Sequence, residues 1–283
     1  MTTSKIISYQ KNTVQADNIS AIKLLESVSF IQNTDIAKFA EFDAHGFIAG
    51  AGESIDEFKT RLNSLHKALL EIQKALEEKG ESDVIDFVRL KKDSKISAEI
   101  LDEASEITQS LYAFSIDWVP GFFLSKSLGW LWGGCAISFY DSQLTVFLIR
   151  SIFAKKRKWL FYRRDELLAH ELCHVARMPI KDKNFEEFFA YRLSPSRFRR
   201  YLGSCFRTQM DSLLFILPIF LLLAVQLVVT ITLLPIPILP FWIFAGFFPA
   251  FFVFRNQLRR NTFFRAKNKL DSFIVCKAMP VLF

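Results

Sequence analysis

The clearest feature of the hydrophobic pattern is a long uncharged segment in the last third of the chain. No charged residue occurs from 212 to 254, a run about twice the ~20 apolar residues with which one helix spans a bilayer. Three prolines lie between 235 and 240, and each removes a backbone donor and resists continuation of a helix. The pattern predicts a hairpin of two membrane helices, over about 213–234 and 236–254. The alternative is an unusually apolar hairpin buried in a soluble core.

Basic residues flank this run on both sides. They are Arg197, Arg199, Arg200 and Arg207 before it, and Arg255, Arg259, Arg260, Arg265, Lys267 and Lys269 after it. Because positively charged flanks stay in the cytoplasm, we expect both ends of the hairpin and both termini on that side. No apolar segment typical of a signal peptide opens the chain. We expect an integral protein of a bacterial inner membrane, with a cytoplasmic tail over 257–283 that is first basic and then apolar.

The first part of the chain, 1–110, shows helical periodicity. Ser54 and Glu57 have the spacing of a capping box before a helix that Gly80 would end. Apolar residues recur through this helix at Phe58, Leu62, Leu65, Leu69, Ile72 and Leu76. A second helix is predicted over 96–111, with Ile96, Ile100, Ala104 and Ile107 on one face. We interpret this part as an ordinary helical packing region rather than a binding module.

The segment that follows is rich in aromatic residues and glycine. Charges interrupt 112–140, so its uncharged stretch is too short to span a membrane. We expect a buried or interfacial segment that ends in a short strand over 135–140, then another strand over 143–153. The basic run 155–158 suits anionic lipid headgroups or solvent better than nucleic acid, because no nucleic-acid motif accompanies it.

Composition supports a membrane protein. Hydrophobic residues make up 51% of the chain and aromatic residues 15%, including 31 Phe, which is too apolar for an ordinary soluble domain. The net charge of +7 would suit nucleic acid, but its position beside the uncharged run favours lipid. Four scattered cysteines without a C-x-x-C pair suggest reduced thiols in a cytosolic setting. They are Cys135, Cys173, Cys205 and Cys276.

Candidate chemistry is concentrated in the segment HELCH, which begins at His170 and ends at His174. No glycine or proline occurs from 159 to 178, so we predict that the motif lies on a helix of about four turns. Residues four apart share one helix face, and both imidazoles can therefore reach one metal ion. Glu171 is placed to polarise a water molecule at that metal.

A third ligand is expected from the segment that follows. A catalytic zinc site has three protein ligands and one open position, and 184–192 offers Glu186 and Glu187 on a second predicted helix. We favour Glu187 as the ligand, because the small Ala190 that follows lets the two helices approach closely. Glu186 would then face solvent or support a ligand. The alternative is a charged pair on a solvated helix face.

The stretch D-E-L-L-A-H-E-L-C-H-V, followed by E-F-F-A-Y, resembles membrane-embedded gluzincins, the type that includes CAAX prenyl proteases and the bacterial heat-shock membrane protease. The resemblance covers roughly 165–193. It implies that His170, His174 and Glu187 bind Zn²⁺ and that Glu171 is the general base. The family has an aspartate after the alanine of its second motif, where this chain has tyrosine. The gap between the motifs is also short, and the membrane hairpin follows both, so the resemblance implies a divergent relative.

The residue that would stabilise the oxyanion of the reaction is less defined. No histidine occurs after His174, so a downstream histidine cannot do so. Tyr191, one helical turn after Glu187, is the first candidate, and Arg192 or Arg177 is the next. The alternative for Tyr191 is packing between helices. Cys173 lies in the motif but is expected to point away from the histidines as a buried thiol.

These observations predict an α+β fold that is mainly α. It would contain zincin-like metal-binding helices with a small sheet (111–208), the N-terminal helical region and the transmembrane hairpin (209–256). The expected function is a zinc endopeptidase that cuts polypeptides at the cytoplasmic membrane face, with the lipid bilayer as its other partner and no nucleic acid. Two alternatives are a non-catalytic membrane scaffold in which the motif is coincidental, and a zinc hydrolase of another substrate class.

Overall fold

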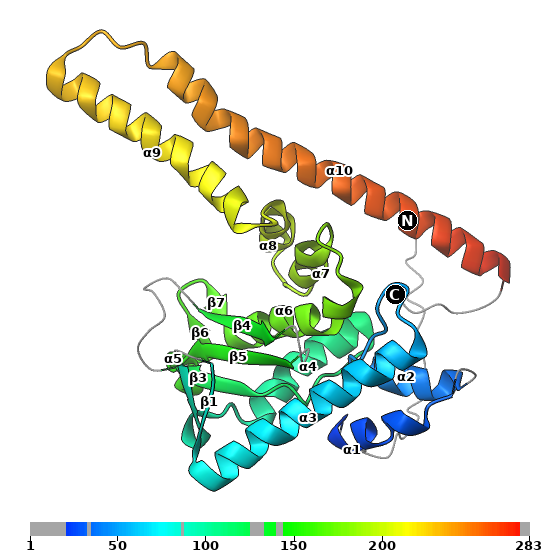
Figure 1. Ribbon diagram of the computed structural model, residues 1–283. Helices are drawn as coiled ribbons and strands as arrows, with labels where there is room; N and C mark the ends of the chain where they lie inside the picture. Colours follow the sequence, from blue (N-terminus) through cyan, green and yellow to red (C-terminus); the bar gives the residue numbers. More distant parts are fainter. Residues whose placement is uncertain (1–20, 33–34, 86–87, 125–132, 140–143, 278–283) are drawn as a thin grey trace, which may run out of the picture.

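A long helical hairpin projects from a body of shorter helices and small sheets (Figure 1). The computed structural model describes residues 21–32, 35–85, 88–124, 133–139 and 144–277. The predicted mainly helical character, with small sheets and two apolar helices, is confirmed. Parts of the predicted strands, Tyr140 and Gln143, and the end of the apolar tail over 278–283 lie outside the described residues.

The elements of the described chain are as follows. The helices are α1 (Ala21–Glu26), α2 (Ile36–Ala44), α3 (Ile55–Lys79), α4 (Ala98–Tyr112), α5 (Ile152–Lys155), α6 (Arg164–Arg177), α7 (Glu186–Arg192), α8 (Arg197–Leu202), α9 (Gln209–Thr232) and α10 (Leu239–Lys277). The strands are β1 (Glu81–Ile85), β2 (Val88–Lys91), β3 (Gly121–Leu124), β4 (Gly134–Phe139), β5 (Leu144–Arg150), β6 (Lys158–Trp159) and β7 (Tyr162–Arg163).

Helix α3 begins and ends where its sequence predicts. The Ser54 side chain accepts a hydrogen bond from the Glu57 amide, and Glu57 accepts one from the Ser54 amide at 2.7 Å, which completes the capping box. Gly80 follows the helix at φ 71°, a left-handed conformation that glycine adopts without strain. All six apolar positions of the predicted face are buried, so this face of α3 forms part of the hydrophobic core.

The buried face of helix α4 overlaps the predicted face only in part. Leu101, Ala104, Ser105 and Thr108 are its buried residues, whereas the isoleucines of the predicted face at 100 and 107 are only partly buried. The two hydroxyl groups tolerate burial because they donate hydrogen bonds to backbone carbonyls, Ser105 to Ile116 at 2.7 Å and Thr108 to Phe114 at 3.0 Å. Helix α4 packs along α6 and so supports the helix that carries the histidines.

The central sheet has the strand order β3-β5-β4. Strand β3 is parallel to β5 and β4 is antiparallel to it, and β5 is buried from Leu144 to Ile149. The predicted strands over 135–140 and 143–153 correspond to β4 and β5, but the second one ends at Arg150 and turns into α5. Strand β3 was not expected from the sequence. Strand β4 is an edge of this sheet and packs against α6.

The helix that carries HELCH, α6, has 14 residues, which confirms the predicted length of about four turns. Residues 158–163 form the small antiparallel hairpin β6–β7, and Leu160 in its turn has φ 48°. The absence of glycine and proline from 159 to 178 did not prevent this turn. Asp165 then lies in the first turn of α6, where a negative charge is favourable.

Asp165 joins the β6–β7 hairpin to α6 through buried ion pairs. Its carboxylate accepts hydrogen bonds from Arg163 at 2.6 Å and from Arg157 at 3.2 Å. Burial raises the pKa of Asp165, but hydrogen bonds from Arg163, the Glu166 amide and Arg157 outweigh it and hold that pKa below its usual range.

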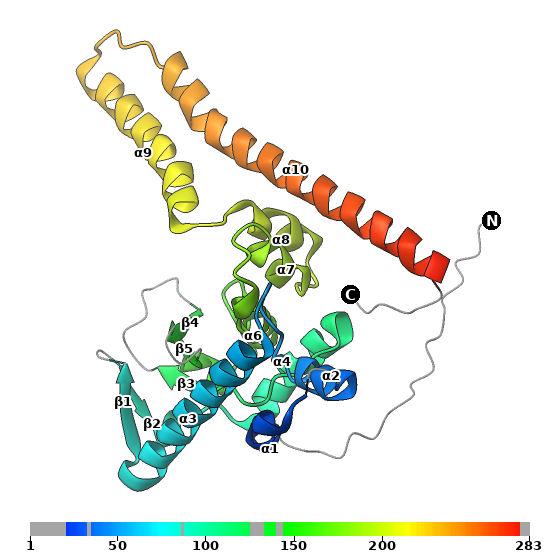
Figure 2. The ribbon, with the colours of Figure 1, turned by 45° about the vertical axis from the view of Figure 1, so that its right-hand side comes forward.

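The two apolar helices form the predicted hairpin, and both are long and apolar enough to cross a membrane, over Met210–Thr232 and Leu239–Ser272 (Figure 2). The connection over 233–238 contains two of the three clustered prolines. The predicted end of the second helix near 254 is wrong. Helix α10 continues to Lys277, because no glycine or proline interrupts the basic segment. The described part of the expected separate tail is therefore the second half of α10.

An ion pair closes the base of the hairpin. Arg255, the first charged residue after the uncharged run, contacts Asp211, the last charged residue before it, at 2.6 Å. The same guanidinium donates to the Cys205 carbonyl at 2.9 Å. Asn256 donates to the Tyr201 carbonyl at 2.8 Å. These contacts fix the start of α9, the middle of α10 and the end of α8 to one another.

The Asp165 contacts yield a stability prediction. Asp165→Asn should lower the free energy of unfolding by about 1–3 kcal/mol at pH 7, because a buried, hydrogen-bonded carboxylate is lost. Since the folded-state pKa is lowered, the carboxylate stabilises the protein above its unfolded pKa, near ~4, and this contribution disappears as the pH falls through the folded pKa. Urea unfolding of the detergent-solubilised chain at pH 7 and pH 3 should show the difference shrinking. The exposed Asp102, changed to Asn, is the control, and a difference independent of pH would contradict the assignment.

Candidate metal centre

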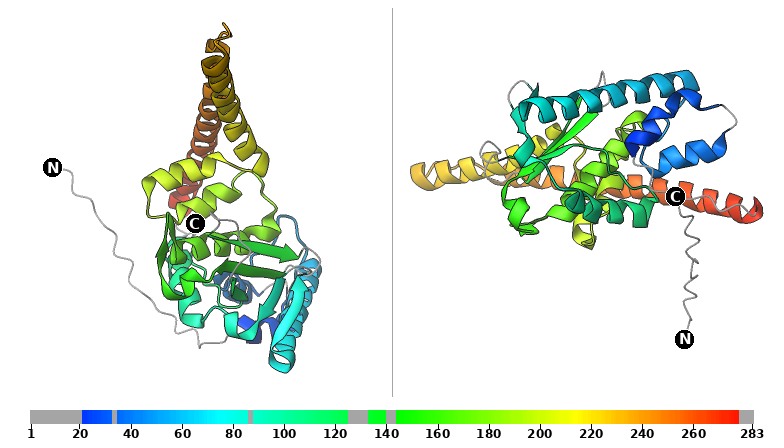
Figure 3. Two further views of the ribbon diagram at one scale, coloured as in Figure 1. Left: turned by 90° about the vertical axis from the view of Figure 1, so that its left-hand side faces the viewer. Right: turned by 90° about the horizontal axis from the view of Figure 1, so that it is seen from below.

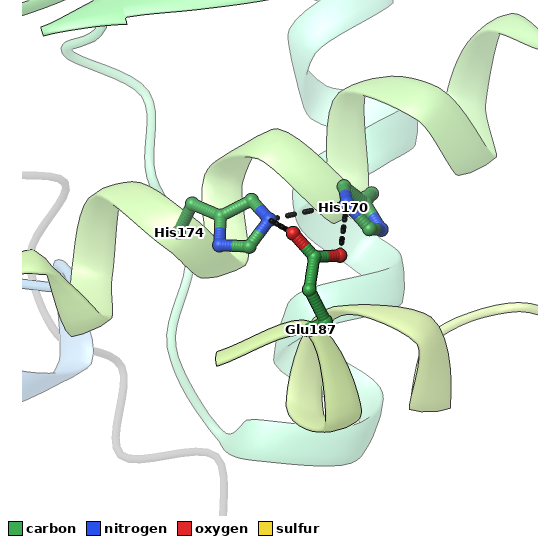
Figure 4. A group of neighbouring side chains, drawn as sticks. All are labelled: His170, His174 and Glu187. Atoms are coloured by element: carbon green, nitrogen blue, oxygen red, sulfur yellow. Dashed lines mark hydrogen bonds and ion pairs between the residues drawn. The ribbon is translucent and has the colours of Figure 1, made fainter. Parts of the chain in front are cut away.

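Two helices bring three potential ligands together (Figure 4). His170 and His174 lie one turn apart on α6, and Glu187 reaches them from the first turn of α7. The Glu187 carboxylate oxygens lie 3.6 Å from the Nε2 atom of each histidine. The two Nε2 atoms are 3.1 Å apart. The three residues predicted as metal ligands therefore converge on one point.

The donor set fits a divalent metal ion. The ligand atoms all lie within 4.8 Å of one another, and two imidazole nitrogens with one carboxylate are a ligand combination that zinc favours. Nitrogens about 2.0 Å from a tetrahedral ion lie about 3.3 Å apart, close to the 3.1 Å between the Nε2 atoms here. Within the described residues, no other group of His, Cys, Asp and Glu converges in this way.

Glu186 orients one of the ligands. Its carboxylate lies 3.1 Å from Nδ1 of His174, which leaves Nε2 of that ring directed at Glu187. Arg177 lies 3.6 Å from Glu186 and also 3.6 Å from Asp182. Glu186 thus contacts a candidate ligand instead of facing solvent alone, and contacts of this kind fix ring orientation in metal sites.

Helix α7 is held in place by aromatic contacts on both sides. The Tyr112 hydroxyl of α4 donates to the Phe189 carbonyl at 2.6 Å. On the other side, the Phe188 and Phe263 rings lie 4.8 Å apart, which links α7 to α10. Ala190 is buried, as expected for a small residue where α7 approaches α6. The position of Glu187 therefore depends on α4, α6 and α10 together.

Burial dominates the electrostatics of the centre. It lowers the pKa of His170 to about 3, with a further contribution from His174, and raises the pKa of Glu171 to about 7, where Glu187 adds to the effect. Burial also raises the pKa of Glu187. For His174, burial lowers the pKa, but the Glu186 hydrogen bond and the neighbouring carboxylates outweigh it and the net shift is upward. A cation among these groups would replace shared protons.

A cleft of about 330 Å³ opens beside the histidines. It lies between the β6–β7 hairpin on one side and α7 and α8 on the other, and both His170 and Glu171 line it. Within the described chain, the Glu171 carboxylate accepts no hydrogen bond. Glu171 is thus free to exchange a proton with a molecule in the cleft.

Tyr191 lines the same cleft. Its ring centroid lies 4.6 Å from that of His170. Burial, followed by the charge of Glu187, raises the pKa of Tyr191 to about 12, so the phenol keeps its proton. Gly203 packs against the ring, because a Cβ atom there would lie only 2.3 Å from it. The two reserve candidates for this role, Arg192 and Arg177, do not line the cleft.

Both arginines lie elsewhere because aromatic rings hold them. The Arg177 guanidinium lies 3.9 Å from the Phe189 ring centroid, and that of Arg192 lies 5.2 Å from Phe263.

Cys173 is buried, as expected, and burial raises the pKa of its thiol to about 12. It takes no part in the ligand group.

The far side of the centre is formed by the sheet. Burial, then the charge of Glu171, raises the pKa of the Cys135 thiol to about 11, which reflects how near β4 lies to Glu171. The outer edge of β4 has no strand partner among the described residues. The strand that was predicted over 135–140 therefore lies at an edge of the sheet beside α6.

The residues that form the walls of the cleft were not identified from the sequence. Phe161 in the β6–β7 turn is 76% exposed and Phe198 on α8 is 72% exposed, and both lie at the cleft. Arg199 of α8 pairs with Glu166 of α6 at 3.0 Å and joins the two sides. The one available signal was the presence of aromatic residues in otherwise charged stretches. Their convergence depends on tertiary packing that no local pattern encodes.

No family model matches this chain, and neither the curated proteins nor the solved structures compared with it include a match.

The geometry predicts one divalent metal ion per chain. Glu187→Ala should abolish binding, because it removes a ligand. Glu186→Gln should weaken binding by about 10–100-fold, because it removes only the support of His174. Metal content measured by mass spectrometry after dialysis against a graded chelator checks both, with Glu71→Ala on the exposed face of α3 as the control. Equal metal content in the Glu187→Ala variant and the wild type would contradict the assignment.

Proposed function

We propose that the chain is an integral-membrane zinc endopeptidase, a divergent relative of the gluzincins. The main supporting observation is the convergence of His170, His174 and Glu187 beside a cleft that His170 and Glu171 line, where the Glu171 carboxylate accepts no hydrogen bond from the described residues. A structural zinc site is closed by four protein ligands, whereas a catalytic one keeps a position open. Three converging ligands and an adjacent cleft fit the second arrangement.

Zinc in such a site would supply Lewis acidity, activating water and polarising a peptide carbonyl. The chain's own residues would transfer the protons of the reaction. Glu171, with its pKa raised to about 7 by burial, would take a proton from the attacking water and deliver it to the leaving amine. A carboxylate with a pKa near the working pH is suited to both directions of transfer.

Tyr191 is the proposed oxyanion stabiliser. Its phenol keeps its proton at neutral pH, since its pKa is raised to about 12, and its ring contacts that of His170. A hydroxyl placed at the edge of the metal centre can donate to the oxygen on which charge develops. The packing of Gly203 against the ring supports a fixed position for this donor.

The cleft favours an extended polypeptide as substrate. The free edge of β4 offers backbone donors and acceptors to a peptide strand. The exposed rings of Phe161 and Phe198 supply apolar contacts for side chains at the mouth. These features favour a peptide over a small hydrolysable ester or amide.

The position of the cleft supports a substrate in or near the membrane. Helices α9 and α10 project from the end of the body at which α7 and α8 lie (Figure 3), and α8 also forms a wall of the cleft. With both basic flanks in the cytoplasm, the centre would lie at the cytoplasmic surface, for which we keep the bacterial inner membrane as the proposed location.

The proposal predicts that Glu171→Gln lowers peptide hydrolysis by about 10²–10⁴-fold while zinc content stays the same, because Glu171 moves protons and does not bind the metal. Hydrolysis of fluorescein-labelled casein by the detergent-solubilised chain measures the first effect and elemental analysis the second. Wild-type protein that holds zinc but cuts no peptide would favour another substrate class. Protein without zinc would favour a scaffold.

Tyr191→Phe separates the catalytic and packing roles of the phenol. It keeps the ring that packs on His170 and Gly203 and removes only the hydroxyl. We expect kcat to fall by about 10²–10³-fold, with KM and zinc content little changed. An unchanged kcat would assign Tyr191 to packing alone.

A further inference from the structure

A second pocket, of about 480 Å³, lies on the other side of α7 and α8. Different faces of the same helix, α8, line the two pockets. Phe198 and Arg199 of α8 line the cleft, whereas Arg197 and Arg200 line the second pocket. Helix α10 forms its remaining wall through Arg260. We call it the arginine pocket, because Arg192, Arg197, Arg200 and Arg260 all line it.

The four arginines have no compensating charge. Within the described chain, no acidic side chain lines the pocket and none of the four forms an ion pair. Arginines close by do find carboxylates: Arg199 pairs with Glu166 and Arg255 with Asp211. Like charges in one concave site repel one another, so four unpaired guanidinium groups there indicate a site for an anion.

Aromatic rings hold two of these guanidinium groups in place. Arg192 lies 5.2 Å from the Phe263 ring centroid, and Arg260 lies 5.2 Å from that of Tyr201. These contacts limit the movement of both guanidinium groups at the pocket wall. Planar forks of this kind bind phosphate oxygens in pairs, which a lysine ammonium group does not.

With α9 and α10 inserted in a membrane as proposed, the pocket would lie at the depth of lipid headgroups. Arg255 is the first charged residue after the uncharged run, and Arg260 lies five residues further along α10, about 7.5 Å at 1.5 Å per residue. The headgroup layer is about 5–8 Å thick on each side of the hydrocarbon core. Tyr201 of α8 contacts Gln257 of α10 at 3.4 Å and holds α8 at the same level.

The rim of the pocket favours a lipid over a free anion. Leu111 is 36% exposed and Phe264 is 42% exposed, and both line the pocket beside the arginines. Apolar groups at the rim of a basic site suit the glycerol ester region below a phosphate. Inorganic phosphate would leave them in water.

We propose that the arginine pocket binds the phosphate group of an anionic phospholipid in the cytoplasmic leaflet. The inference takes from the proposed function only the membrane insertion of α9 and α10, and does not require that the chain cuts peptides. A bound headgroup would join α7, α8 and α10 through one set of charge-assisted hydrogen bonds. Because α7 and α8 also form a wall of the cleft, the lipid would stabilise that wall.

The test is thermal unfolding of the full chain in neutral detergent, titrated with the short-chain lipid dihexanoyl phosphatidylglycerol. Parallel titrations use dihexanoyl phosphatidylcholine and inorganic phosphate. A ligand of the folded state raises the melting temperature in proportion to its occupancy. We expect phosphatidylglycerol to raise it, with phosphatidylcholine and inorganic phosphate giving little change.

Variants test whether the stabilisation by phosphatidylglycerol depends on the arginine pocket. Arg197→Gln/Arg200→Gln should weaken the apparent affinity for phosphatidylglycerol by about 30-fold, taking about 1 kcal/mol for each basic residue. Lys155→Gln/Lys156→Gln, which removes the same charge outside the pocket, should have little effect. Arg197→Lys/Arg200→Lys should retain part of the affinity. Equal losses in the arginine-to-glutamine and lysine-to-glutamine pairs, or no loss in the former, would overturn the proposal.

Two further results would also overturn it. Equal stabilisation by inorganic phosphate and phosphatidylglycerol would show that the ligand of the pocket is a free phosphate and not a lipid. Alkaline carbonate extraction of membranes separates the remaining cases. A chain that carbonate releases lacks the membrane insertion on which both proposals rest. A chain that stays in the membrane, but whose melting temperature phosphatidylglycerol does not change, contradicts lipid binding in the arginine pocket alone.

Discussion

The close approach of α7 to α6 is the constraint on which the rest of the structure depends. It places the Glu187 carboxylate 3.6 Å from both imidazoles, in a buried region that also contains Glu171. Burial raises the pKa of both carboxyl groups, and the charge of Glu187 adds to the shift of Glu171. The arrangement persists because Tyr112 of α4 and Phe263 of α10 contact α7 from two sides. The folded body thus holds a charge arrangement that a divalent cation would relieve.

This constraint joins the candidate metal centre to the apolar hairpin. The part of α10 that follows the uncharged run packs against α7 through Phe263, and the Asp211–Arg255 ion pair fixes where that part begins. Helices α7 and α8 are therefore shared. One side of the pair lines the cleft at the metal centre, and the other lines the arginine pocket. A contact with lipid on one side and a substrate on the other would act on the same two short helices.

Features set by short-range patterns could be predicted from the sequence. The i, i+4 spacing of His170 and His174, the capping box at Ser54 and the uncharged hairpin each depend on neighbours along the chain. The β6–β7 hairpin was not predicted and the buried face of α4 was predicted only in part, because tertiary contacts override local propensity there. The length of α10 was underestimated, although no glycine or proline interrupts the segment 255–277. The convergence of Glu187 with the two histidines was predictable, but the contact of Glu186 with His174 and the packing of Gly203 on Tyr191 arise only when distant segments meet.

The most direct test of the central claim is X-ray absorption at the zinc edge of the purified chain. The account predicts zinc in a four-coordinate site with only nitrogen and oxygen ligands at about 2.0–2.1 Å, two of them imidazoles, and a changed spectrum in the Glu187→Ala variant. Absence of zinc, a sulfur ligand at about 2.3 Å, or a spectrum that is the same in the variant would contradict it.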